Sequence, residues 1–143
     1  MIKYYDIVSR LKAAIENIER VNKCEHGTFD EISLQRAKVF PYTHFDVVAG
    51  TPTDNTFSYD IPIMCMSQVR EIGESDNKLD VLNEQLIVIN QIVNFFRVNG
   101  ELYPDYQLEG EPTFQKFEND HKSDFAGWDT TLTIVTNNDL PPC

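Results

Sequence analysis

The sequence predicts an α+β fold in which two amphipathic helices pack on one face of a mostly antiparallel sheet. Residues 4–21 and 79–98 repeat apolar side chains every three or four positions, which is typical of a helix with one buried face. Residues 57–65 and 128–135 instead alternate apolar and polar side chains, as half-buried strands do. The strand segments follow one another across short turns, so we expect hairpins.

The first helix is expected over residues 4–21. Its apolar positions are Tyr4, Ile7, Val8, Leu11, Ala14, Ile15, Ile18 and Val21. Glu16 and Arg20 are four residues apart on the other face, in the order that favours an ion pair. Gly27 is a suitable stop after this helix. Residues 28–41 have irregular apolar spacing and predict a short strand or an irregular crossing.

The first group of strands is expected between residues 43 and 65. Residues 43–49 are apolar enough for a strand, and the Gly/Pro/Asn-rich residues 50–55 predict a hairpin loop. Residues 57–65 give the clearest strand pattern in the chain. Pro62 has no N–H to donate, so that side of the strand should meet an edge or a bulge.

The second helix is expected over residues 79–98, after a charged loop at 70–78. Asn77 and Asp80 resemble a capping box at its start. Gly100 is well placed for its C-cap. Its apolar stripe is Leu79, Leu82, Leu86, Ile89, Val93 and Phe96, widened by Ile92 and Phe95.

The remaining chain predicts more strands and a tail. Residues 101–127 are acidic and aromatic and fit one or two short strands. Residues 128–135 are rich in β-forming side chains. Residues 137–143 contain two Asn and two Pro and should form a flexible tail. With 143 residues, we expect a single domain over 1–143.

The charge balance excludes several classes of partner. The chain has 12 Lys and Arg against 23 Asp and Glu, a formal net charge of −11. A protein this acidic is a poor partner for nucleic acid or for an anionic membrane. Apolar runs are too short for a transmembrane helix, and the N-terminal residues do not resemble a signal peptide. The three widely spaced cysteines predict neither a disulfide framework nor a zinc ribbon, so we expect a cytosolic setting.

Candidate catalytic residues are few. The six glycines are too far apart for a phosphate-binding loop. Cys24 and His26 could act as nucleophile and base, but no third residue marks an orienting group, and an ordinary turn explains both. We therefore expect no catalytic or cofactor-binding residue.

Candidate metal ligands also have ordinary explanations. Glu118 and His121 have the spacing of half a carboxylate-bridged di-metal site, but the second half is missing and a solvated acidic loop fits better. Met64 and Met66 flank Cys65 and suggest soft-metal ligands. On a strand, however, the cysteine points away from both methionines. We expect a structural role for all five and no metal site.

Several local strings resemble the small ring proteins at the neck and tail junction of tailed bacteriophages, the tail-terminator and tail-completion group. The strings are Asn17–Asn22 with Phe29–Ile32, Phe40-Pro41-x-x-His44, Asp80–Asn83 with Asn90–Val93, and Phe125–Trp128 followed by a Thr/Ile/Val strand. Together they touch most of the chain. Within this group the chain resembles structural proteins of crAss-like and related phages.

The resemblance implies a tail-terminator-like fold and a virion structural protein without catalysis or cofactors. Such proteins form a homo-oligomeric ring, commonly a hexamer, with a dodecamer as the alternative. The ring joins or ends the tail tube, meets the head-tail connector or stopper, and lets DNA pass without sequence-specific binding. It is assembled in the host cytoplasm, with no membrane partner. An acidic lumen would repel DNA phosphates and let the genome slide.

A closed ring uses two different patches on each subunit. The strand at 57–65 is the expected inter-subunit edge. The interface candidates are Phe57, Tyr59, Ile61, Ile63 and Trp128. Alanine at Phe57 and Tyr59 should then weaken ring formation and leave the monomer folded.

Two other functional classes are weighed against the ring. An acidic adaptor or inhibitor would cover a basic partner in a one-to-one, salt-dependent complex. An enzyme of small-molecule metabolism would need a pocket with clustered titratable residues, and the sequence shows none. The position of the ring within the neck or tail is left open.

Overall fold

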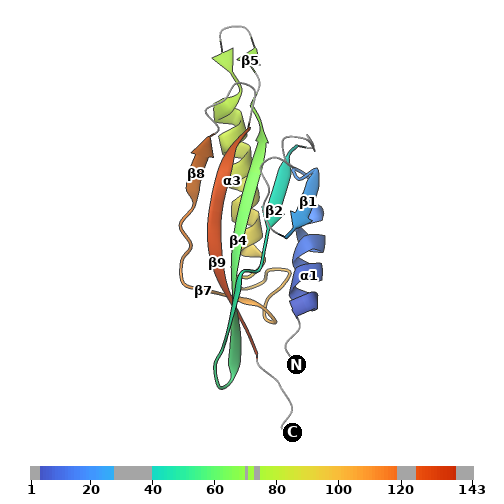
Figure 1. The fold of residues 1–143 in the computed structure, drawn as a ribbon. Coiled ribbons are helices and arrows are strands. Elements are labelled where there is room, and N and C mark those ends of the chain that lie inside the picture. The colour runs from blue at the N-terminus through green and yellow to red at the C-terminus, as the bar shows by residue number, and fades with distance from the viewer. Residues whose placement is uncertain (1–3, 28–39, 70, 73–74, 119–124, 138–143) are drawn as a thin grey trace.

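The computed structural model describes residues 4–27, 40–69, 71–72, 75–118 and 125–137 (Figure 1). The expected crossing at 28–39, His121 and the expected tail after residue 137 lie outside the described residues. The helices are α1 (Tyr4–Glu16) and α3 (Lys78–Asn94). The strands are β1 (Lys23–His26), β2 (Tyr42–Phe45), β3 (Ala49–Pro52), β4 (Thr56–Gln68), β5 (Glu71–Ile72), β6 (Ser75–Asp76), β7 (Gln107–Glu109), β8 (Gln115–Glu118) and β9 (Phe125–Asn137).

The sheet is mixed, which corrects the expectation of a mostly antiparallel one. Seven strands form one sheet in the order β1-β2-β4-β9-β7, with β3 pairing with β4 and β8 with β9. The long strands β4 and β9 are antiparallel along their whole length. β1 and β2 are parallel. A parallel pair needs a crossover connection rather than a tight turn.

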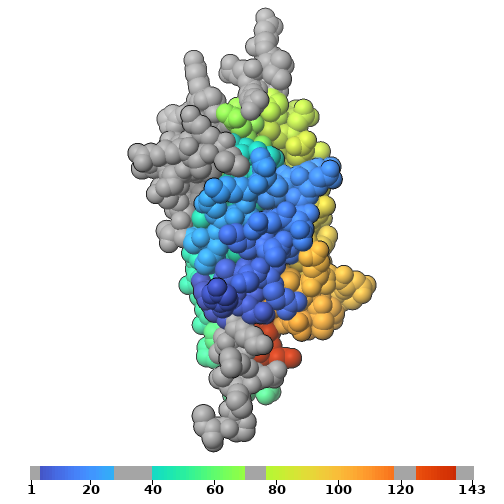
Figure 2. Space-filling view, turned by 90° about the vertical axis from the view of Figure 1, so that its right-hand side faces the viewer, coloured from blue at the N-terminus to red at the C-terminus, as the bar shows by residue number. Residues whose placement is uncertain are grey.

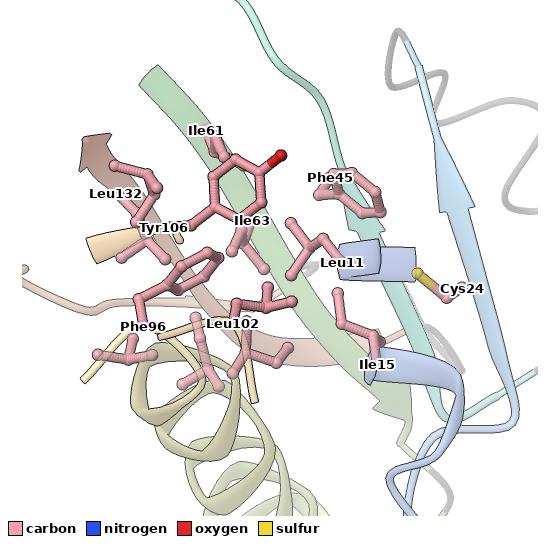
Figure 3. Close-up of a cluster of buried hydrophobic side chains, with 14 of the residues drawn as sticks. Leu11, Ile15, Cys24, Phe45, Ile61, Ile63, Phe96, Leu102, Tyr106 and Leu132 are labelled. Atoms are coloured by element: carbon pink, nitrogen blue, oxygen red, sulfur yellow. The ribbon is translucent and has the colours of Figure 1, made fainter. Parts of the chain in front are cut away.

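Both helices pack on the same face of the sheet, so the predicted α+β class is confirmed. Alternate residues of β4 contact α1 and α3 in one buried cluster (Figure 3). Members of this cluster include Ile7, Leu11 and Ile15 from α1, Tyr59, Ile61, Ile63 and Cys65 from β4, Val88, Ile89, Ile92 and Val93 from α3, and Leu132 and Ile134 from β9. The face of the sheet away from the helices is called the open face below.

Helix α1 is shorter than predicted. The apolar pattern of residues 4–21 continues beyond the end of the helix into turns, which the sequence alone does not distinguish from helix. The helix ends at Glu16, and Ile18 and Val21 then donate backbone hydrogen bonds three residues back. Val21 is only 8% exposed and belongs to the core, which explains why the helical spacing continues up to that residue. Gly27 does not stop the helix. It follows β1 with a φ of 127°, which an L side chain rarely adopts.

Helix α3 also ends early, at Asn94, where Phe95 and Phe96 change to hydrogen bonds three residues back. Gly100 is therefore not its C-cap. Asn77 is the N-cap, but it makes no side-chain cap hydrogen bond, and its amide donates to the Gln68 carbonyl at 3.5 Å. The predicted capping box is therefore not formed.

The first strand group differs in its boundaries. The expected strand at 43–49 is two strands, β2 and β3, separated by residues 46–48. Pro62 of β4 lies opposite this interruption, since β2 reaches only to Ile63 and β3 begins opposite Asp60. Residues 46–48 form a bulge here, and the Asp46 N–H donates to the Pro62 carbonyl at 3.2 Å. The side of Pro62 that lacks an N–H therefore meets a bulge, one of the two predicted alternatives. The loop expected at 70–78 instead contains the short β5–β6 hairpin.

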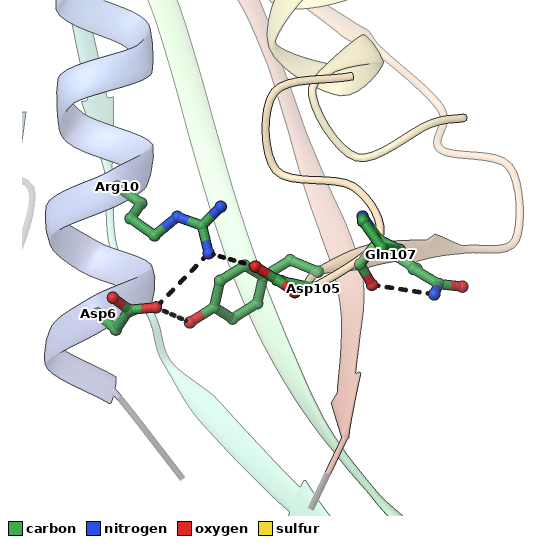
Figure 4. A network of polar contacts seen from close by, with 6 residues as sticks. Asp6, Arg10, Asp105 and Gln107 are labelled. Atoms are coloured by element: carbon green, nitrogen blue, oxygen red, sulfur yellow. Dashed lines mark hydrogen bonds and ion pairs between the residues drawn. The ribbon is translucent and has the colours of Figure 1, made fainter. Parts of the chain in front are cut away.

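A polar network connects α1 with the segment before β7 (Figure 4). Tyr106 donates to the Asp6 carboxylate at 2.6 Å, and Arg10 donates to Asp105 at 3.0 Å. The Arg10 guanidinium also lies 5.3 Å from the centre of the Tyr106 ring. Burial and the Asp6 carboxylate both raise the pKa of Tyr106. Figure 2 shows α1 on the surface beside this segment. The network therefore fixes α1 against a part of the chain about 100 residues away.

Candidate assembly surfaces

Three of the five predicted interface residues belong to the core. Tyr59, Ile61 and Ile63 are at most 2% exposed and face the helices. β4 is an inner strand, with β2 and β3 on one side and β9 on the other. The prediction that it forms the inter-subunit edge is therefore wrong. An alternating pattern shows that one face is buried but does not show which layer buries it.

Phe57 and Trp128 are half-buried, but they lie at opposite ends of the β4–β9 ladder. The Phe57 ring lies over Gly50, where a Cβ would come within 2.7 Å of it, and is 4.9 Å from the Tyr59 ring. Trp128 donates its indole N–H to the Leu82 carbonyl at 2.8 Å. Phe57 thus stabilises a hairpin and Trp128 holds α3 against the sheet, so the five candidates form no single surface patch.

The β3–β4 hairpin projects beyond both helices (Figure 1). Residues 48–55 are all exposed, and we call 48–57 the hairpin arm. Its turn is held locally, because Thr53 accepts from the Thr56 N–H at 3.1 Å and donates to the Thr56 carbonyl at 3.0 Å. The arm is ordered by these bonds and by the pairing of β4 with β9, yet residues 48–55 stay exposed.

The open face contains a pocket of about 330 Å³. His44, Met64 and Asp129 form one row across β2, β4 and β9. Pro62 and Met64 supply an apolar floor, and Asp46 adds a second carboxylate. The pocket therefore combines two acidic groups with apolar surface.

The His44 ring at this pocket is fixed by two hydrogen bonds. Its Nε2 donates to the Gly27 carbonyl at 2.6 Å, and its Nδ1 lies 2.9 Å from the Tyr42 hydroxyl. The same hydroxyl is 3.0 Å from Glu25. The pKa of Glu25 is lowered mainly by its contact with Lys23, and to a smaller extent by the hydrogen bond from this hydroxyl. These hydrogen bonds link β1 to β2 and so stabilise the parallel pair.

Asp129→Asn is expected to stabilise the protein at pH 7. Burial raises the pKa of Asp129, so its charged form is less favourable in the folded state than in the unfolded state. The natural protein should gain stability as the pH falls through this raised pKa, and the variant should lack that gain. Urea unfolding at pH 7 and at about pH 4 measures the difference. Asp54→Asn, at the exposed turn, is the control; a variant no more stable than this control would contradict the expectation.

The candidate nucleophile and metal ligands have structural positions. Burial raises the pKa of both Cys24 and Cys65 to about 12, which keeps the thiols protonated at neutral pH. Cys65 faces the helices, whereas Met66 lies in a cluster with Tyr42 and Phe125 on the open face. Across the described ranges, no three His, Cys, Asp or Glu residues are grouped in a way that could hold a metal ion. The Glu118 and His121 motif lies partly outside these ranges.

The sequence analysis did not predict one surface, the outer side of α3. Part of the apolar stripe that was predicted to be buried lies on this side. Leu79 is 82% exposed and Leu86 is 36% exposed, whereas Gln85 is fully buried. A signal was present, since residues 85–96 contain no Asp, Glu, Lys or Arg.

Comparison with known proteins adds no relative. No protein-family model matches the chain, and no curated protein matches its sequence. In the part of the chain that the structure describes, neither helix is long and apolar enough to cross a membrane.

Proposed function

We propose that the chain is a structural subunit of a homo-oligomeric ring at the neck or tail end of a tailed bacteriophage, where the ring joins or terminates the tail tube and lets DNA pass. The observation that carries this proposal is the hairpin arm. Strand β3 is an edge strand that pairs with β4, so its other side offers unpaired backbone groups to a neighbouring chain. The hairpin projects past the helices with residues 48–55 exposed. Packing on a neighbouring subunit would bury it.

The strand order supports the proposal, because a closed ring joins two different patches of each subunit. The arm and β1 lie on one side of the β4–β9 pair, and β7 and β8 lie on the other. An arm reaching from one subunit can therefore meet a different surface on the next. The net charge of −11 per subunit suits a channel that repels DNA phosphates. The resemblance of the sequence to tail terminators favours six copies, with twelve as the alternative.

Shortening the arm tests the proposal. Residues 52–57 are replaced by Asn-Gly, so that Thr51 and Ser58, which already pair, flank a two-residue turn. Native mass against concentration and negative-stain images should show rings for the natural chain and none for the shortened one. Circular dichroism checks that both are folded.

Asp54→Asn is the matched control, because it keeps the length of the arm, and it should still form rings. Rings formed by the shortened chain would contradict the role of the arm. A natural chain that stays monomeric at every concentration, alone and with phage tail tubes, would contradict the ring itself.

A second candidate function is an acidic adaptor that covers a basic partner, and the open-face pocket favours it. Asp46 and Asp129 would meet the charged end of a Lys or Arg side chain, while Pro62 and Met64 would contact its methylene groups. This function predicts a one-to-one complex that weakens steeply with salt. Titration with a basic protein at low and high salt distinguishes it from a salt-resistant ring.

A further inference from the structure

The outward side of α3 carries apolar side chains and amides where a solvated helix usually carries charges. We call it the α3 outer face. It consists of Leu79, Asn83, Leu86, Ile87, Asn90, Gln91 and Asn94, all of them exposed. Charged residues make up 24% of the chain, yet none occurs from Gln85 to Phe96. The helix therefore has a buried face toward the sheet and an outer side that carries no charge from Gln85 onward, whereas Asp80 and Glu84 are exposed nearer its N-terminus.

The residues of this face form a seam of the kind that helices use to pair. Leu79, Asn83, Leu86 and Asn90 recur at steps of four, three and four positions, which places them in one line along the helix. Leucine and asparagine alternate in this line. In paired helices, leucine supplies apolar contact and a buried asparagine fixes the register.

We propose that the α3 outer face is the docking site for a second copy of this chain, with α3 packed against α3. Two chains of charge −11 repel each other through most of their surfaces. The half of α3 from Gln85 to Asn94 carries no charge, so two copies can approach there with less electrostatic repulsion. Amide side chains are both donors and acceptors, so a face rich in Asn is complementary to itself. A strongly charged partner would find no matching charge on the half of the helix from Gln85 to Asn94.

The two helices run antiparallel in this pair. With the twofold axis between Leu86 and Ile87, Asn83 of each copy lies opposite Asn90 of the other. The acidic Asp80 and Glu84 then face the uncharged C-terminal half of the other helix instead of each other. The helix dipoles are also opposed, which is favourable. A parallel pair would bring Glu84 of both copies together.

The contact is small, so the pairing should be weak and concentration-dependent. A helix of 17 residues is about 25 Å long, and one helix pair buries less than the roughly 1,600 Å² of a standard interface. Because no ion pairs form, added salt should not weaken the association. This pairing goes beyond the proposed ring and does not depend on it, since it joins like surfaces whereas a ring joins unlike ones.

Sedimentation equilibrium over about 1 to 200 µM tests the inference. Leu86→Glu places a carboxylate beside the twofold axis in both copies and should weaken pairing by about tenfold or more. Val98→Glu is the matched control, because Val98 is an exposed apolar residue beyond α3. It should leave the pairing unchanged. Thermal unfolding shows whether each variant keeps the fold.

Charge complementation identifies the occupant. A mixture of Leu86→Glu and Leu86→Lys chains should associate more tightly than either variant alone, because the two opposite charges meet at the axis. If the natural chain forms rings, Leu86→Glu should halve their native mass by separating paired rings.

Three results would overturn the inference. They are a natural chain that shows no pairing through this face, a Leu86→Glu variant that associates as well as the natural chain, and a mixture without rescue. If Leu86→Glu instead loses binding to tail tubes while self-association is unchanged, the occupant is another protein. Single rings formed by the natural chain would keep the proposed function and reject the pairing.

Discussion

Gly127→Ala is expected to lower the free energy of unfolding by about 3 kcal/mol or more. Gly127 lies opposite Met66 in the β4–β9 ladder. A Cβ at this position would collide with the Cys65 carbonyl group and lie 2.8 Å from the Met66 Cα. These are backbone atoms of an inner strand, so they cannot move without disturbing the whole ladder.

Urea unfolding followed by circular dichroism measures this loss. Thr131→Ala is the control, since Thr131 is exposed on the same strand and its loss should change stability by less than about 0.5 kcal/mol. A Gly127→Ala protein within about 1 kcal/mol of the natural one would show that β4 and β9 can separate locally at this point.

Ile61→Ala and Phe57→Ala are expected to separate the predicted interface residues into two classes. Ile61 is fully buried between the sheet and the helices, so its truncation should cost about 2–5 kcal/mol. Phe57 is half-buried on the hairpin arm, so Phe57→Ala should leave the monomer folded and weaken assembly. Tyr59 is only 2% exposed, so the expectation that alanine there spares the monomer is withdrawn.

Thermal unfolding and native mass, measured on the same samples, test this pair of variants. Ile61→Ala should melt at a lower temperature in proportion to its lost stability. Phe57→Ala should melt near the natural protein but shift toward smaller species. Equal melting temperatures for the two variants would contradict the assignment of Ile61 to the core.

The fold class could be predicted because hydrophobic period is a local property. The alternation at 57–65 and the helical spacing at 79–98 identify β4 and α3 directly. The parallel pairing of β1 could not be predicted, because it depends on where residues 27–41 carry the chain. The helix ends were missed for a related reason: Val21 and Phe96 are buried through turns that keep the helical spacing.

The candidate surface was less predictable than the fold. Apolar side chains mark burial in the monomer and burial in an assembly equally well, and Ile61 and Leu86 look alike in sequence. Gln85 shows the reverse difficulty. It is fully buried, and neither side-chain amide atom has a hydrogen-bond partner among the described residues. Polarity alone would have placed it on the outside.

The β4–β9 ladder also sets the order of events when the protein is made. Gln68 pairs with Phe125, 57 positions later, and Thr56 pairs with Asn137, 81 positions later. Pairing across such separations is slow, because a large loop must close before any bond rewards it. Until β9 has been synthesised, β4 lacks its long neighbour and the sheet that carries the core is incomplete. The complete sheet therefore forms only after the last strand has been made, and β4 stays without its long partner until then.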